Sequence, residues 1–93
     1  MTGASTLSLP PRLDHEGTRI LQEALRGFRG KALRLDAGKT TFLGALGLQV
    51  LLAAAQQWRS EGHHFAITSC SPAFADDLLR LGAELSDLNE DQL

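Results

Sequence analysis

The sequence predicts a small α/β domain in which strands and helices alternate. Short stretches of alternating apolar residues occur at residues 5–9, 31–36 and 63–69, and a segment with apolar residues at helical spacing follows each of them. Because a helix between two strands implies a parallel, right-handed crossover, this β-α-β-α-β-α order predicts a mixed, mostly parallel sheet. The 93 residues suffice for one domain, residues 1–93, with a core at about residues 5–85. We expect residues 86–93 to form an acidic flexible tail.

The first strand and helix are predicted between residues 5 and 30. Ser5–Leu9 alternates weakly, which is typical of a short edge strand, and Pro10-Pro11 ends it because proline donates no backbone hydrogen bond. Asp14 is the expected N-cap of the helix, accepting from the N–H of Glu16 or Gly17. Gly27 and Gly30 are expected to end the helix. Its buried stripe is predicted to contain Ile20, Leu21, Ala24, Leu25 and Phe28.

Two further helices are predicted after the second and third strands. The one at residues 45–59 is apolar nearly all round, with a narrow polar stripe at Gln49, Gln56 and Ser60, as expected for a helix packed on a sheet. The other begins at Ser71-Pro72, a hydroxyl N-cap followed by proline at the first helical position. Its buried side is predicted to contain Phe74, Leu78 and Leu81. A last short edge element is expected near residues 83–85.

The composition argues against a protein that binds nucleic acid, spans a membrane or is secreted. The chain is 43% hydrophobic and 22% charged, with a net charge of −2, so no basic face favours nucleic acid or an anionic membrane. The longest apolar stretch, residues 43–55, is short of the about 20 residues that a membrane span needs, and the N-terminus lacks the pattern of a secretory signal. Cys70 is the only cysteine, which excludes an internal disulfide. These features predict a cytoplasmic protein without direct membrane insertion.

The Gly38-Lys39-Thr40 turn does not match the sequence pattern of a nucleotide-binding loop. A phosphate-binding loop of the Walker A type needs a glycine five residues before the Gly-Lys-Thr, and Leu33 stands there instead. A phosphoacceptor site like that of receiver domains, built on Asp36 and Lys39, would require an early acidic pair that is missing. We expect no cofactor and no metal site, and no nucleophile, base and orienting acid stand together as a catalytic group.

The chain resembles the STAS domain family, the sulfate-transporter and anti-sigma-factor-antagonist group. The resemblance is carried by LPPRLDHEGTRILQEAL, LRLDAGKTTFLGALGLQVLLAAA and HHFAITSCSPAFADDLLRLGA, which are similar to the first-helix entry, the central strand, turn and helix, and the next strand and helix of that family. It implies a non-enzymatic protein-interaction module of bacterial regulation. The family often has an additional N-terminal strand and a C-terminal strand and helix, so we expect sheet edge or core surface that a partner covers.

The sequence departs from the family at the residue that anti-sigma-factor antagonists phosphorylate. Their turn reads Asp-Ser-Ser, and the first serine is the phosphoacceptor, whereas this chain has Gly44, Ala45 and Leu46. Alanine has no hydroxyl, so phosphorylation at the usual site is excluded. The nearest hydroxyls, Thr40 and Thr41, are the remaining candidate phosphorylation sites.

The resemblance implies a docking surface at the N-terminal turn of the second helix. Asp14 corresponds to an aspartate that faces the partner beside the turn, although it also serves as a helix cap. The implied partner is a kinase-like anti-sigma factor, a chemotaxis component or another switch protein. Alternatives are a subunit that braces an ATPase in a membrane transport complex, and a small anionic-ligand sensor. The predicted partner-binding residues are Asp14, Gly44, Ala45, Leu46, Gly47, Leu48 and Gln49.

Three other residue types have less specific roles. His15, His63 and His64 are expected at the surface, because neighbouring residues on a strand point to opposite faces and His63 and His64 therefore cannot readily bind one ion. Cys70 is interpreted as a small residue at a strand end. Trp58 is predicted to pack in the core rather than to act as an exposed anchor.

Overall fold

The computed structural model describes residues 5–89 and confirms a small α/β domain. In chain order its elements are β1 (Ser5–Ser8), β2 (Arg12–Leu13), α1 (His15–Arg26), β3 (Leu33–Ala37), β4 (Phe42–Leu43), α2 (Ala45–Ser60), β5 (Phe65–Cys70), α3 (Pro72–Arg80) and α4 (Leu85–Asn89). The three predicted strands and three predicted helices are all present. The pair of short strands β2 and β4 and the helix α4 are additional to the predicted elements.

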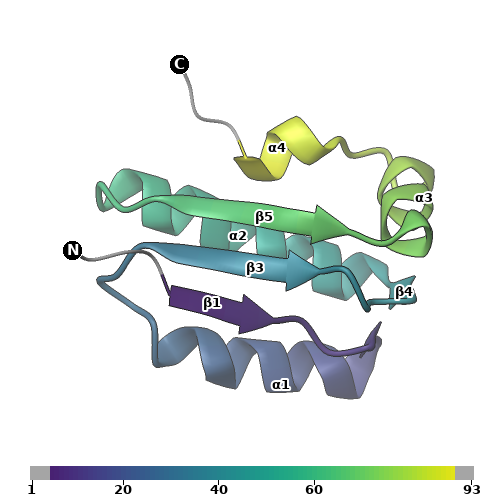
Figure 1. Ribbon diagram of the computed structural model, residues 1–93, viewed down its shortest axis with the longest axis horizontal. Coiled ribbons are helices and arrows are strands. Elements are labelled where there is room, and N and C mark those ends of the chain that lie inside the picture. Colours follow the sequence, from purple (N-terminus) through teal and green to yellow (C-terminus); the bar gives the residue numbers. More distant parts are fainter. Residues whose placement is uncertain (1–4, 90–93) are drawn as a thin grey trace.

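The main sheet has the order β1-β3-β5, and its strands run parallel (Figure 1). Leu7 pairs with Leu35, which in turn pairs with Ile67. After Leu35 the register shifts by one residue, so that Asp36 pairs with Ser69. β1 is an edge strand, as its sequence predicts, and β5 forms the other edge.

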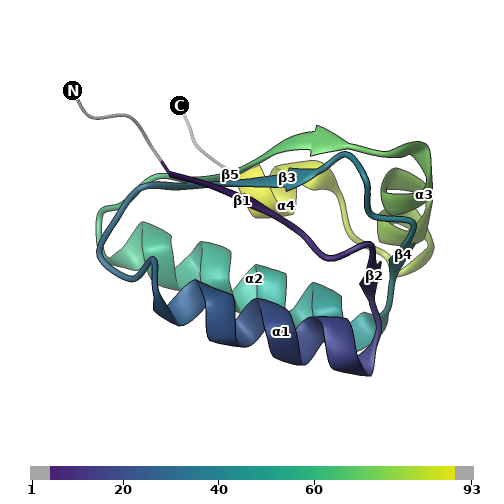
Figure 2. The same ribbon diagram turned by 60° about the horizontal axis from the view of Figure 1, so that its bottom comes forward.

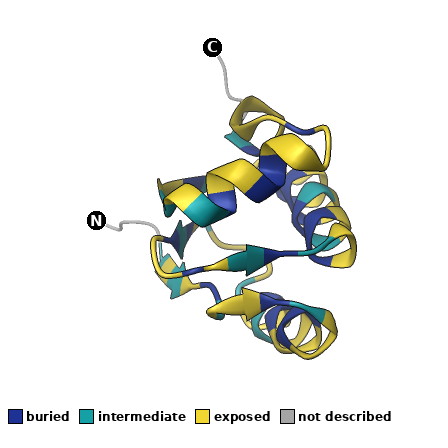
Figure 3. Ribbon diagram, turned by 90° about the vertical axis from the view of Figure 1, so that its right-hand side faces the viewer, coloured by how far each residue is buried: buried dark blue, intermediate teal, exposed yellow. Residues whose placement is uncertain are grey.

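The helices α1 and α2 lie side by side on one face of the sheet (Figure 2). Buried leucines of the strands, such as Leu33 and Leu35, meet Leu21 of α1 and Leu51 of α2, each at most 1% exposed. Viewed from the end that carries α3, exposed residues cover the outer surface of the helices and buried residues face inward (Figure 3). The core therefore lies between the sheet and the helix layer.

Local capping explains where the helices start. The Asp14 carboxylate accepts a hydrogen bond from the Gly17 amide at 2.9 Å, which makes it the N-cap of α1. The Ser71 hydroxyl accepts from the Phe74 amide at 3.0 Å, and Pro72 occupies the first turn of α3. Both predicted helix starts are confirmed.

Some expectations about burial and the C-terminus are wrong. Helical spacing predicts Ile20 and Leu81 on buried stripes, whereas Ile20 is 46% exposed and Leu81 is 37% exposed. Within residues 5–89 no strand lies beyond β1 to cover Ile20, and Leu81 follows the last residue of α3. Residues 85–89 form α4 instead of an edge strand or a tail, because Leu88 is fully buried in the core. Residues 90–93 of the predicted tail lie outside the described residues.

Candidate docking site at two helix N-termini

The first residues of α1 and α2 lie next to each other. The short strands β2 and β4 pair in parallel, Arg12 with Phe42 and Leu13 with Leu43. One residue further along, the Gly44 amide donates a hydrogen bond to the Leu13 carbonyl at 3.1 Å. Since Asp14 follows Leu13 directly, this ladder places the predicted aspartate beside the predicted turn.

Two glycines allow tight packing at these helix starts, Gly17 within the β2–α1 segment and Gly47 between α2 and α1. A Cβ atom on Gly17 would lie 1.8 Å from the Arg12 carbonyl oxygen, which no side chain can tolerate. A Cβ atom on Gly47 would lie 3.1 Å from the Leu13 Cβ and 3.2 Å from the Thr18 hydroxyl. Gly47 therefore brings the first turn of α2 against the first turn of α1.

The Asp14 carboxylate is held in place and charged. The hydrogen bond from the Gly17 amide holds the pKa of Asp14 below its usual value, and the Arg12 guanidinium, 3.5 Å away, acts in the same direction. Arg12 also lies over the Phe42 ring, 4.6 Å from its centroid. The site thus carries a fixed negative charge with a cation and an aromatic ring beside it.

The predicted turn divides into exposed and buried residues. Ala45 and Gln49 are exposed and Leu46 is 49% exposed, so these three side chains are available to a partner. Gly47 and Leu48 are buried and support the turn from inside. Gly44 is the N-cap of α2 and has no side chain to accept a hydrogen bond from the first-turn amides. α1 has a carboxylate cap and α2 has none.

The two candidate phosphorylation sites differ in access. The Thr40 side chain is fully buried, and its hydroxyl donates to the Pro10 carbonyl at 3.0 Å. Thr41 is exposed, and its hydroxyl donates to the Pro11 carbonyl at 3.2 Å. In this conformation a kinase can reach Thr41 but not Thr40.

The turn at residues 36–40 is a structural junction. The Asp36 carboxylate accepts from the Gly38 amide at 2.8 Å, the local Asx pattern that stabilises a turn. The Ser71 hydroxyl donates to the Thr40 carbonyl, which ties the junction to the start of α3. The Gly-Lys-Thr sequence therefore connects strands and helices by local hydrogen bonds.

Asp77 is a supporting residue that sequence analysis missed. From α3 its carboxylate accepts from the Leu43 amide at 2.9 Å and pairs with Arg80 at 2.7 Å. The hydrogen bond from Leu43 lowers the pKa of Asp77, and Arg80 lowers it further. Asp77 thereby fixes the residue that precedes the α2 turn. An acidic residue on a helix gives no sequence signal for a contact with a backbone 34 residues away.

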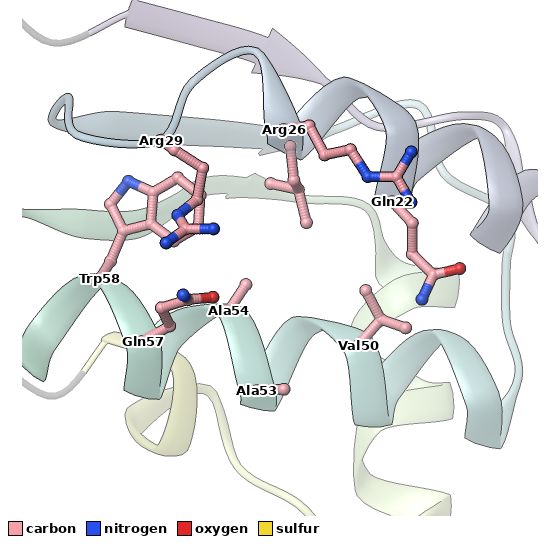
Figure 4. A pocket seen from close by; sticks show the side chains of 9 residues that line it. Gln22, Arg26, Arg29, Val50, Ala53, Ala54, Gln57 and Trp58 are labelled. Carbon is pink, nitrogen blue, oxygen red and sulfur yellow. The ribbon is translucent and has the colours of Figure 1, made fainter.

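The other residues singled out from the sequence lie away from this turn. Trp58 packs in the core at 2% exposure and its indole N–H donates to the Lys31 carbonyl at 2.7 Å, which confirms the packing prediction. It forms one end of a groove of about 240 Å³ between α1 and α2, rimmed by Gln22, Arg26 and Arg29 (Figure 4).

Burial raises the pKa of the Cys70 thiol at the end of β5, so the thiolate is not favoured there.

The described residues contain no group of three histidine, cysteine or acidic residues arranged to hold a metal ion. Over the same residues no helix combines the length and the apolar character that crossing a membrane requires.

The family resemblance is confirmed by comparison with known proteins. Residues 2–88 match the sequence model of the family described as "Mlab, STAS domain". Comparison with curated proteins and with solved structures gives no significant match. STAS domains in general are non-catalytic and mediate protein–protein interactions.

Proposed function

The chain belongs to the STAS domain family, and on that premise we propose that it is a non-catalytic docking module of bacterial regulation, active in the cytoplasm. Its partner binds at the paired helix starts, where Ala45, Leu46 and Gln49 are exposed beside the Asp14 carboxylate. The observation that carries this proposal is the Leu13–Leu43 pairing, which places Asp14 next to the α2 turn.

The chemistry of the site indicates what the partner contributes. An exposed leucine favours an apolar pocket, and the Asp14 carboxylate favours a cation or an N–H donor. The first-turn amides of α2 have no acceptor from the N-cap residue, so a carboxylate or carbonyl oxygen of the partner can accept from them. An apolar contact rimmed by polar groups is typical of protein interfaces.

Docking of this kind is not switched by phosphorylation within the turn, because Ala45 has no hydroxyl. The partner classes are those that the family resemblance implies: a kinase-like anti-sigma factor, a chemotaxis component or another switch protein. The missing phosphoacceptor also favours a second candidate, a permanent subunit that braces the ATPase of a membrane transport complex. A permanent subunit needs a contact surface that phosphorylation cannot block, and the turn with Ala45 is such a surface.

Matched variants of α2 test the site. Ala45→Glu places a charge in the turn, and Ala53→Glu places the same charge at an exposed position two turns further along the helix. In affinity purification from the source cells, we expect Ala45→Glu to lose the partners that both the unmodified protein and Ala53→Glu retain. If Ala45→Glu recovers the partners as well as Ala53→Glu does, the α2 turn is not the binding site. Recovery of a transporter ATPase instead of a signalling protein would favour the second candidate.

A further inference from the structure

The two edges of the main sheet differ in how their backbone groups are satisfied. At the β5 edge, the side-chain amide of Asn89 accepts from the Ile67 N–H at 2.7 Å and donates to the Ile67 carbonyl at 3.2 Å. Asn89 thus takes the place that a neighbouring strand would occupy. Within residues 5–89 no side chain or backbone segment does the same at β1.

The outer edge of β1 presents a row of backbone groups that have no partner within residues 5–89. The Ser5 amide donates to the carbonyl of Ala32, the residue before β3, at 3.2 Å, and the Leu9 amide donates to the carbonyl of Asp36 in β3 at 2.9 Å. Because these directions alternate along a strand, the N–H and C=O groups of Thr6 and Ser8 point away from the sheet. Both residues are exposed, and residues 5–9 carry no charge of the kind that usually protects an edge.

An apolar cavity lies directly beside this edge. It has a volume of about 400 Å³ between β1 and α1, and its walls include Leu7, Leu9, Pro11, Ile20 and Ala24. Packed helices lie about 8–10 Å apart and neighbouring strands about 4.8 Å, so each helix covers two strand positions. α1 extends past β1 at the lower side of Figure 1, and within residues 5–89 no strand occupies the second position, so that Ile20 is 46% exposed.

We propose that an extended segment of a partner protein adds to β1 as a fourth strand and places an apolar side chain in this cavity. Its backbone pairs with Thr6 and Ser8, and its inward side chain covers Ile20. None of the residues that line the cavity belongs to the α2 turn, so the inference does not depend on the docking function proposed above.

The charges on α1 indicate the sequence of the added strand. Glu16 and Glu23 lie four residues before and three residues after Ile20, about 6 Å and 4.5 Å along the helix axis. Side chains on one face of a strand are about 6.6 Å apart, so basic residues two positions before and after the apolar residue reach both carboxylates. Arg19 pairs with Glu16 at 2.6 Å and with Glu23 at 3.2 Å, which leaves one net negative charge.

The same charges disfavour a second copy of this chain as the occupant. An antiparallel β1–β1 pair centred on Leu7 would place Glu16 of one copy near Glu23 of the other, on both sides of the axis. Like charges at that position repel each other, whereas a basic–x–apolar–x–basic segment is attracted. The partner is therefore a different protein with such a segment.

A capped peptide of sequence Thr-Lys-Thr-Leu-Thr-Lys-Thr tests this inference on the intact protein. Titration of the ¹⁵N-labelled protein should give saturable shifts of the Thr6 and Ser8 amide signals with a Kd of about 1 mM or lower. Exchange of those two amide protons with solvent should slow when the peptide binds. The same peptide with glutamate in place of lysine should bind about fivefold more weakly at low salt.

Matched variants separate strand pairing from general attraction. Ser8→Pro removes the outward N–H and should weaken binding about tenfold, whereas Ser8→Ala keeps that N–H and should bind like the unmodified protein. Ile20→Ser should weaken binding, while Leu79→Ser, at a leucine that is 68% exposed on α3, should not.

Three results would overturn the inference. The first is the absence of saturable binding, and the second is equal binding to Ser8→Pro and Ser8→Ala. The third is a dimer of the free protein in sedimentation that Ser8→Pro abolishes, which would make a second copy the occupant. Because none of these variants alters the α2 turn, failure here leaves the docking proposal intact, and failure of Ala45→Glu leaves this one intact.

Discussion

The Gly44 amide donates to the Leu13 carbonyl at 3.1 Å, so the N-cap residue of α2 is hydrogen-bonded to the residue that precedes Asp14. This one hydrogen bond continues the β2–β4 ladder to the point where both helices start. Asp14 and the α2 turn are 30 residues apart in sequence, and their relative position depends on this ladder and on the glycines packed behind it. Substitutions that disturb the ladder should therefore affect stability and docking together.

Gly17→Ala should strongly destabilise the protein. The new methyl group would lie 1.8 Å from the Arg12 carbonyl oxygen, so either β2 or the first turn of α1 must move. We expect the free energy of unfolding to fall by about 3 kcal/mol or more. Gly27→Ala is the matched control, because its backbone is α-helical and its new methyl group would lie 3.5 Å from the nearest atom. Urea denaturation measures both, and equal stabilities would contradict the close approach.

Thr18→Val should leave stability unchanged or raise it by up to about 1 kcal/mol. The Thr18 hydroxyl is buried at 1% exposure and has no hydrogen-bond partner among residues 5–89. Valine keeps the branched shape beside Gly47 and removes the cost of burying an unpaired hydroxyl. Thr18→Ser keeps the hydroxyl and loses the methyl group, so it should be less stable than the native protein. A marked loss of stability in Thr18→Val, seen in thermal unfolding, would indicate that the hydroxyl is paired in solution.

The fold could be predicted because its local signals agree with the tertiary packing. Asp14 and Ser71 are N-caps in the structure as in the sequence, and the alternation at Phe65 and Ile67 matches a half-buried strand. Ile20 was assigned to the core because periodicity gives the face of a helix but not how far the sheet extends over it. α4 was missed because a helix of five residues has little periodicity, and it forms mainly because Leu88 packs in the core.

The site was only partly predictable. The resemblance brought Asp14 and the turn together, and the β2–β4 pairing places them side by side. Which turn residues face outward could not be read from the sequence, since Gly47 and Leu48 are buried by their contacts with α1 and the core. The supporting role of Asp77 could not be predicted, because its contact with the Leu43 amide joins elements that are distant in the chain.

Acidification should reduce stability through Asp77. In the folded protein the Leu43 amide and Arg80 hold the pKa of this carboxyl below its ordinary value of about 3.9, so the unfolded chain binds more protons at low pH. The contribution of Asp77 is therefore complete above about pH 5 and is lost as the pH falls through its folded pKa. Asp14 has a lowered pKa and acts in the same direction.

Asp77→Asn isolates this contribution, because its amide oxygen still accepts from Leu43 but does not titrate. Urea unfolding between pH 7 and pH 3 should show a smaller loss of stability for Asp77→Asn than for the native protein. Parallel pH profiles would mean that Asp77 has the same pKa in the folded and unfolded states.

Asn89→Ala should open the second edge of the sheet. The substitution removes both hydrogen bonds to the Ile67 backbone, which are 2.7 Å and 3.2 Å long. The N–H and C=O groups of Ile67 are then exposed to solvent. We expect a loss of about 1–2 kcal/mol in the free energy of unfolding and faster exchange of the Ile67 amide proton. Asn89→Asp should be worse still at neutral pH, because a carboxylate accepts from the N–H but repels the carbonyl oxygen.

An open β5 edge is also expected to make the protein associate, since a free row of backbone groups pairs with other strands. Sedimentation over a range of concentrations should show self-association of Asn89→Ala beyond that of Ser86→Ala, an exposed position on the same helix. If Asn89→Ala remains monomeric and the Ile67 amide stays protected, another group covers that edge. In that case Asn89 is not what distinguishes the β5 edge from the open edge at β1.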